Sequence, residues 1–263
     1  MTIIQWQLSQ IYYSYCFLPL ILIFLFLFIS CSGDTILEDD KQLNLNQLKS
    51  IDNVFEAGLK LMAMPNGLHE LELIDSKQKT LVISVHGNNS RGYEWIYPLQ
   101  VINSETNLIT FFRWDDNSCV NPSINILNEL IQEKLKENKN IQNVILFGHS
   151  YGGLLVASFM EEWTGELPIE IHTIAAPLKG LGSLSLICNY KTPVQVTKKS
   201  SLFEWRTIKK IDGACQNLNY DPQNVEIIGS KVTRLPDTYN NNKLGHNWSI
   251  SWVADNLNKG IQR

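Results

Sequence analysis

The sequence predicts an α/β fold in which helices cover both faces of a mostly parallel sheet. Apolar strand-like runs alternate along the chain with segments of helical spacing, and this alternation is typical of parallel sheets. One apolar run, 144–147, enters the sequence Gly148-His149-Ser150-Tyr151-Gly152 and passes straight into an apolar helical segment, 154–157. A strand that turns sharply into a helix at a serine flanked by glycines is typical of the same class, and it singles out Ser150.

Ser150 occupies the tight turn of a Gly-x-Ser-x-Gly pattern. Such a turn leaves no room for side chains at Gly148 and Gly152, and it holds the serine in a strained conformation that exposes its hydroxyl. Gly153 allows the following helix to pack close to the sheet. The alternative is a glycine-rich turn whose serine only caps the helix. The strand before the pattern and the helix after it favour a nucleophile.

The strands and helices can be placed along the chain from their spacing and their turn residues. We expect a hairpin of strands 59–64 and 68–74 around Pro65-Asn66-Gly67, further strands at 81–85, 107–114, 169–177 and 224–229, and helices over 121–135 and 248–257. In a parallel sheet the loops after the strands lie along one edge, where ligands bind. Asn88, Ser150, Pro177 and Gly229 lie at the ends of strands and are therefore expected to converge.

Length and charge limit the class of protein. The 263 residues suffice for one domain with a full core plus a short additional segment, and the net charge of −4 argues against a nucleic-acid partner. The histidines and cysteines show no metal-ligand spacing, and there is no phosphate-binding loop, so no metal or cofactor is expected.

The first 31 residues differ from the rest of the chain. Residues 16–30 are almost wholly apolar, which is short for a membrane span of roughly twenty residues and suits a signal peptide. The run ends in Ile29-Ser30-Cys31, which resembles the lipobox of bacterial lipoproteins, where the cysteine is lipidated. No Lys or Arg precedes Lys41, so the usual basic start is missing, and a retained anchor is the alternative. Both interpretations predict a membrane-anchored protein of the cell envelope that faces outside the cytoplasm.

The domain boundaries follow from composition. Residues 1–31 form the signal or anchor, 32–57 a tether with a weak helix at 43–48, and 58–263 the folded domain. Within this domain, 178–223 is interpreted either as a lid or as an ordinary insertion with its own small core.

Outside the leader the chain has three cysteines, Cys119, Cys188 and Cys215. An odd number permits at most one disulfide within the chain, and we expect it between Cys188 and Cys215, with three reduced thiols as the alternative. Asp115 and Asp116 follow a strand end and are interpreted as a solvated turn rather than as pocket residues.

Over about residues 58–258 the chain resembles α/β-hydrolases of the esterase and lipase kind. The resemblance rests on the turn 148–153, called the elbow below, and on three short segments, which are His86-Gly87-Asn88, 175–180 and Leu244-Gly245-His246. It implies a serine nucleophile, a histidine base, an acid and an oxyanion hole, but it is not specific to a substrate.

A serine needs a base within hydrogen-bonding reach to give up its proton. Four of the five histidines have other positions, namely inside the elbow, at the start of the turn 86–88, in a predicted strand and in the early hairpin. They are His149, His86, His172 and His69. The fifth, His246, follows the last strand and precedes the last helix, where family members carry their catalytic histidine. We therefore predict His246 as the base, against the alternative of an exposed histidine before a helix.

The resemblance also implies the oxyanion donors and the acid. The backbone N–H groups of Tyr151 and Asn88 are the expected donors. In relatives an aspartate follows the penultimate strand, three residues beyond a glycine such as Gly229, but that position here is Val232. Asp237 lies a few residues later and is the predicted acid. Asp212 and the use of no acid at all remain as alternatives.

The sequence as a whole predicts a membrane-tethered serine hydrolase that cleaves acyl or lipid esters through an acyl-enzyme on Ser150. An acyltransferase or thioesterase would use the same residues. A hydrolase-fold protein that only binds or scaffolds at the envelope is the alternative of a different class, and the missing aspartate at 232 is its support.

Overall fold

The fold is built around one seven-stranded sheet. The computed structural model describes residues 43–261, and the strands run in the order β1-β3-β2-β4-β5-β6-β7. Only β1 is antiparallel to its neighbour, and all the other pairs are parallel. The strands are β1 Gly67–Glu70, β2 Thr80–Val85, β3 Asn107–Arg113, β4 Asn143–His149, β5 Ile169–Ile174, β6 Ser200–Arg206 and β7 Lys231–Arg234. The predicted fold class is confirmed.

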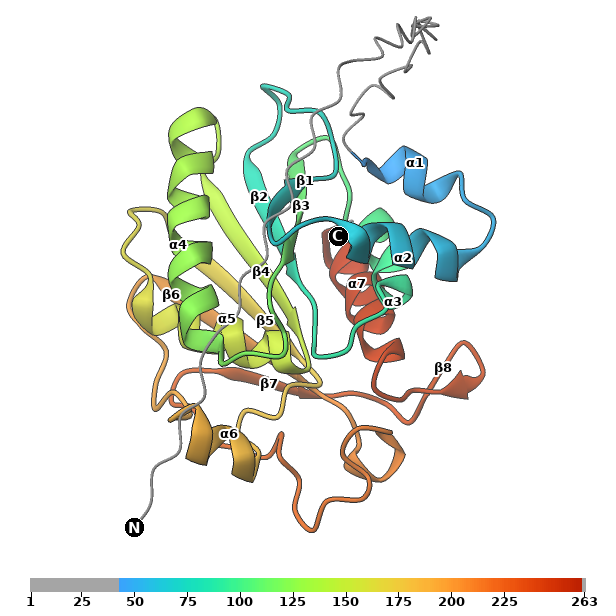
Figure 1. The fold of residues 1–263 in the computed structure, drawn as a ribbon, viewed down its shortest axis with the longest axis vertical. Helices are drawn as coiled ribbons and strands as arrows, with labels where there is room; N and C mark the ends of the chain where they lie inside the picture. Colours follow the sequence, from blue (N-terminus) through green and yellow to red (C-terminus); the bar gives the residue numbers. More distant parts are fainter. Residues whose placement is uncertain (1–42, 262–263) are drawn as a thin grey trace, which may run out of the picture. The chain divides into compact units, whose positions relative to one another are not determined.

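Helices pack on both faces of this sheet (Figure 1). They are α1 Leu45–Lys49, α2 Val54–Ala63, α3 Tyr93–Val101, α4 Val120–Glu137, α5 Tyr151–Glu162, α6 Gly182–Ile187 and α7 Trp248–Ile261, with a short 3-10 turn, η1, at Lys209–Ile211. Alternate side chains of β2 enter two separate cores. Leu81 and Ile83 join the core under α4 and α5, whereas Val82 joins the core under α2, α3 and α7. This two-sided burial explains why the sheet strands read as continuous apolar runs.

The expected hairpin of strands 59–64 and 68–74 is wrong in its first half. Residues 54–63 form helix α2, in which Leu59 is 62% exposed and Leu61 is fully buried. Two residues this close in a strand would lie on the same face, so their opposite burial follows from helical geometry. The Asn53 side chain begins the helix by accepting the Phe55 N–H at 3.0 Å. Strand β1 pairs with β3 instead.

The expected tether also needs correction over its second half. Leu45 and Leu48 of α1 are buried in the same core as α2 and α3. The Leu45 N–H donates to the Leu71 carbonyl at 2.8 Å, which fixes this helix to the chain that follows β1. Residues 43–57 therefore belong to the folded domain.

The strands expected at the β6–β7 edge of the sheet are wrong in two respects. Residues 224–229 form no strand, and Ile228 makes only an isolated bridge to Gln195. Strand β6, which lies within 178–223 and pairs with both β5 and β7, is not among the strands predicted from the sequence. Its alternation is masked because Glu204 and Arg206 are buried, and they are buried because they pair with each other at 2.7 Å.

The disulfide joins Cys119 to Cys188, not Cys188 to Cys215. Cys119 precedes α4 and Cys188 follows α6, so the bond ties the loop after β3 to the segment beyond β5. Cys215 is a buried free thiol.

Replacing both bonded cysteines, Cys119→Ser and Cys188→Ser, is expected to lower the free energy of unfolding by about 2–4 kcal/mol, because the unfolded chain gains the freedom of an open loop. Urea unfolding with and without a thiol reductant measures this. The reductant should destabilise the wild type and leave the double variant unchanged. Equal stability of the wild type under both conditions would contradict the prediction.

The predicted signal or anchor, the predicted lipidation site Cys31 and the first part of the predicted tether lie outside the described residues. Among the helices of residues 43–261, none combines the length and the apolar character that crossing a bilayer requires.

Candidate active site

Ser150 lies between β4 and α5 in the conformation that the elbow pattern predicts. Its backbone has φ 53° and ψ −119°, a region in which residues with a side chain are strained. The flanking glycines are required by space. A Cβ on Gly148 would lie 2.4 Å from the Gly152 carbonyl oxygen, and one on Gly152 would lie 2.4 Å from the His86 carbonyl oxygen. The serine side chain is therefore held outward, at the carboxyl edge of the sheet.

The turn after β2 packs directly against the serine. A Cβ on Gly87 would come within 2.9 Å of the Ser150 Cβ, so glycine is the only residue that fits at this position. Asn88 follows this glycine, and Tyr151 supplies the first N–H of α5, where an N–H has no partner within its own helix. Both residues line a cavity together with Ser150. Their backbone N–H groups remain the predicted oxyanion donors.

His246 is held by a buried carboxylate. Its Nδ1 lies 2.9 Å from Oδ1 and 3.0 Å from Oδ2 of Asp212, which is fully buried. The Ala214 N–H and the Thr207 hydroxyl also donate to this carboxylate. Burial raises the pKa of Asp212, but the hydrogen bond and charge of His246, with the two other donors, outweigh burial and keep it below its usual value. With its proton on Nδ1, the neutral imidazole has a free lone pair on Nε2.

The expected partner of His246, Asp237, is replaced by Asp212. Asp237 is exposed, and its backbone carbonyl accepts the Leu244 N–H at 2.9 Å, closing the small hairpin of β8 (Thr238–Tyr239) and β9 (Asn242–Lys243). The reason for the error is the hidden strand β6. Once β6 is recognised as the penultimate strand of the sheet, the aspartate that follows it is Asp212. Val232 lies within β7, so no acid is missing there.

Sequence reasoning missed the residues that support this pair. His149, treated as the variable residue of the elbow, is buried with its ring centroid 4.6 Å from that of His246, and its Nε2 lies 3.2 Å from the His246 carbonyl oxygen. Gln223 donates to the Thr207 hydroxyl at 2.7 Å and accepts the Thr207 N–H at 2.9 Å. Residues from three distant segments thus position His246 and Asp212, and no local pattern in the sequence predicts these contacts.

The turn at 86–89 is fixed by the loop that follows β3. The Arg113 guanidinium, which can only donate, contacts Nε2 of His86 at 2.5 Å, so the His86 proton lies on Nδ1 and donates to the Gly87 carbonyl at 2.9 Å. In a trans peptide the carbonyl and the N–H point in opposite directions, so this bond turns the Asn88 N–H away from the His86 ring. The Asp116 carboxylate accepts the Asn89 N–H at 2.5 Å.

Asp116 therefore differs from the solvated turn residue that the sequence indicated, since it lines the cavity at Ser150 and holds the turn. Asp115 does match that description, because it is exposed and its carboxylate is occupied by the Ser118 hydroxyl and the Asn117 N–H.

His86 predicts a pH dependence of stability. Burial lowers its pKa to about 4, from an ordinary value of about 6.5. Between these values the unfolded chain binds a proton that the folded protein does not, so the free energy of unfolding rises with pH and falls by roughly 3 kcal/mol as pH drops through this window. His149 and His172 contribute with the same sign, because burial lowers their pKa values too.

The variant His86→Gln should flatten this dependence, and His69→Gln, in β1 away from the site, serves as the control. Urea unfolding at about pH 7 and about pH 4.5 measures the slope. Equal slopes in the wild type and His86→Gln would contradict the assignment.

Two cavities meet at Ser150 and His246. The smaller has a volume of about 190 Å³ and lies toward the start of α3. The larger, of about 750 Å³, is walled by Leu181, Ile187 and the disulfide. Both Ser150 and His246 line both cavities, so a bond to be cleaved at the serine has room for a substituent on each side.

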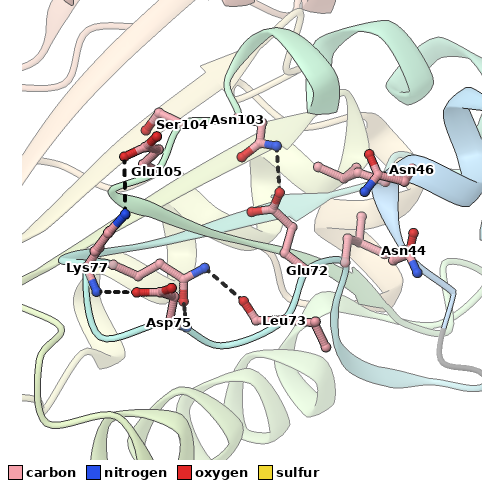
Figure 2. A pocket seen from close by; sticks show the side chains of 12 residues that line it. Asn44, Asn46, Glu72, Leu73, Asp75, Lys77, Asn103, Ser104 and Glu105 are labelled. Carbon is pink, nitrogen blue, oxygen red and sulfur yellow. Dashed lines mark hydrogen bonds and ion pairs between the residues drawn. The ribbon is translucent and has the colours of Figure 1, made fainter.

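A third cavity, of about 490 Å³, lies at the amino ends of β2 and β3, the edge opposite Ser150 (Figure 2). Its charged groups are already engaged. Lys77 lies 3.8 Å from Glu105, and the Asn103 amide donates to Glu72 at 2.5 Å. It contains no nucleophile with a neighbouring base, so the candidate chemistry lies at the Ser150 edge.

No protein-family model matches this chain, and no curated protein does. Several solved structures are similar to it. The lipase-esterase related protein from Clostridium acetobutylicum has 12% identity and a TM-score of 0.48, with 74% of this chain and 98% of that chain covered. A serine hydrolase without a lid from Xanthomonas campestris also has 12% identity and a TM-score of 0.48, covering 74% and 87%. Est1E from Butyrivibrio proteoclasticus has 9% identity and a TM-score of 0.45, covering 71% and 88%.

Proposed function

We propose that this protein is a serine hydrolase that cleaves carboxylic esters through an acyl-enzyme on Ser150. One observation carries the proposal. A strained, outward-facing serine shares two cavities with His246, whose Nδ1 is held by the buried Asp212. The strained backbone of Ser150 and the buried carboxylate of Asp212 both lower the stability of the fold. A serine that only caps a helix would require neither feature.

The expected reaction follows from the geometry. Nε2 of His246 takes the Ser150 proton as the serine oxygen bonds to the ester carbonyl carbon, and the N–H groups of Asn88 and Tyr151 receive the negative charge on the carbonyl oxygen. The imidazolium, stabilised by Asp212, then gives its proton to the departing alcohol oxygen as the ester bond breaks. Water repeats these steps on the acyl-enzyme and releases the acid.

The alternative of a catalytically inactive scaffold loses its support. It rested on the absence of an aspartate at position 232, and the Asp212 carboxylate, 3.0 Å from Nδ1 of His246, offers the acid that position 232 lacks. An inactive binding protein has no need for a strained serine beside a histidine with an occupied Nδ1.

The proposal extends to location. We infer a protein anchored at the membrane through Cys31, facing outside the cytoplasm. The sequence at 16–31 motivates this, although it lies outside the described residues. The disulfide between Cys119 and Cys188 supports it, because such bonds persist in oxidising compartments and are rare in the cytosol. Acyl esters or lipids presented at a membrane are then the substrates within reach.

A fluorophosphonate probe tests the chemistry directly, because it forms a stable adduct only with an activated serine. We expect labelling of the purified protein at Ser150, located by peptide mass spectrometry, and its loss in His246→Ala. An unlabelled protein that circular dichroism shows to be folded would contradict the proposed function.

A further inference from the structure

The smaller cavity beside Ser150 is polar throughout. It contains no aliphatic side chain, unlike the larger cavity with Leu181 and Ile187. It is lined by Gly87, Asn88, Asn89, Ser90, Arg91, Tyr93, Glu94, His149, Ser150, His246 and Asn247. The two substituents of a bound ester therefore meet different surroundings, one wholly polar and one partly apolar.

Glu94 is the least satisfied group in this wall. It is only 8% exposed, and one carboxylate oxygen accepts the Ser90 hydroxyl. The other oxygen, Oε2, is buried and has no hydrogen-bond partner among the described residues. A buried acceptor without a partner costs about 1–3 kcal/mol, and more when it carries charge. Because Glu94 lines the cavity, a ligand hydroxyl that reaches Oε2 would supply the missing partner while Oε1 keeps the Ser90 hydroxyl.

Neighbouring groups offer further hydrogen bonds. The Asn247 side-chain amide donates to the Tyr93 hydroxyl at 2.9 Å, which leaves the Tyr93 hydroxyl hydrogen and the Asn247 side-chain oxygen Oδ1 available within the described part of the chain. The exposed guanidinium of Arg91 adds a donor. The wall thus mixes donors, from Tyr93 and Arg91, with acceptors, from Glu94 and Asn247.

Hydroxyl groups fit this mixture because each one both donates and accepts. An ammonium group would pair with Glu94 but face the positive charge of Arg91, and a carboxylate would pair with Arg91 but face Glu94, whereas a hydroxyl is repelled by neither charge. An alkyl group would leave Oε2 of Glu94 without a partner and would cover the polar groups of Tyr93 and Asn247 without bonding them. The small volume, about 190 Å³, excludes a long chain.

We propose that this cavity binds the alcohol part of the substrate and that this alcohol is a small polyol, glyceryl or glycosyl. Glu94 and Tyr93 contact its hydroxyls, and the acyl part occupies the larger cavity. This inference rests on the proposed function, since it names the alcohol that Ser150 releases.

Butyrate esters of propan-1-ol, glycerol and methyl glucoside share one acyl chain and test the proposal. We expect the wild type to favour at least one polyol ester over the propyl ester by at least about tenfold in kcat/KM, and Glu94→Gln to remove most of this preference. Tyr93→Phe, which removes only a hydroxyl, should reduce the preference without affecting folding. The polyol ester that depends on Glu94 identifies which polyol the cavity takes. Glu105→Gln, in the cavity at the opposite edge, is the matched control.

Two results would overturn the inference. If fluorophosphonate labels Ser150 but all three esters react alike, or if Glu94→Gln slows all three equally, the polyol site is wrong while the proposed function stands. If no adduct forms and no ester is hydrolysed, both proposals are wrong.

Discussion

Replacing Ser150 by alanine or by glycine is expected to lower kcat by about 10⁵–10⁶-fold, because the nucleophile is lost. The two variants should differ in stability. Glycine adopts the observed φ of 53° and ψ of −119° freely, so Ser150→Gly is expected to raise the free energy of unfolding by about 1–3 kcal/mol. Alanine keeps the Cβ and with it the strain, so Ser150→Ala should remain within about 0.5 kcal/mol of the wild type.

Ester hydrolysis and urea unfolding of the three proteins measure these effects. Comparing Ser150→Ala with Ser150→Gly separates the loss of the nucleophile from the loss of strain. Both variants lack the hydroxyl, but only the glycine variant removes the backbone strain. A glycine variant no more stable than the alanine variant would show that the conformation at 150 stores no energy. Retention of more than about one per cent of the activity in either variant would exclude Ser150 as the nucleophile.

Replacing Asp212 by asparagine is expected to lower kcat/KM by about 10³–10⁴-fold. The asparagine keeps the size of the side chain but removes the charge that stabilises the imidazolium. Its amide also donates, so it can hold His246 with the proton on the wrong nitrogen. Asp237→Asn is the matched control, because Asp237 is exposed and, within residues 43–261, its side chain makes no hydrogen bond. It should stay within about twofold of the wild type, as surface substitutions usually do.

Hydrolysis of one chromogenic ester by both variants, with KM and kcat determined separately, decides between the aspartates. The loss in Asp212→Asn should fall on kcat, since Asp212 is fully buried and has no surface with which to bind substrate. A large loss in Asp237→Asn together with an active Asp212→Asn would reverse the assignment. A loss confined to KM would indicate a structural role in shaping the cavity.

The sequence by itself determined the fold class and the conformation of the turn at Ser150. The conformation of Ser150 can be predicted from the sequence because part of the restraint is local. The backbone of α5 leaves no space for a Cβ at Gly148, whereas at Gly152 the space is closed by Val85 and His86, at the end of β2. The continuous apolar runs of β2 to β5 also predicted a sheet buried on both faces. Each run indicates this by itself, because both faces of its own strand are apolar.

Only the tertiary structure shows which carboxylate contacts His246 and which cysteines are bonded. Strand β6 is difficult to recognise in the sequence because two of its buried residues, Glu204 and Arg206, are charged and pair with each other. Without this strand, the sequence predicted Asp237 rather than Asp212, the residue that contacts His246 in the structure. The pairing of Cys119 with Cys188 likewise depends on how distant loops meet at the edge of the sheet.

The Glu204–Arg206 pair can be buried because a later segment completes its hydrogen bonds, with the Ser230 hydroxyl donating to Glu204 and Arg206 donating to the Val225 carbonyl. A thiol likewise bonds only where another segment brings its partner. That information lies in contacts between residues far apart in the chain.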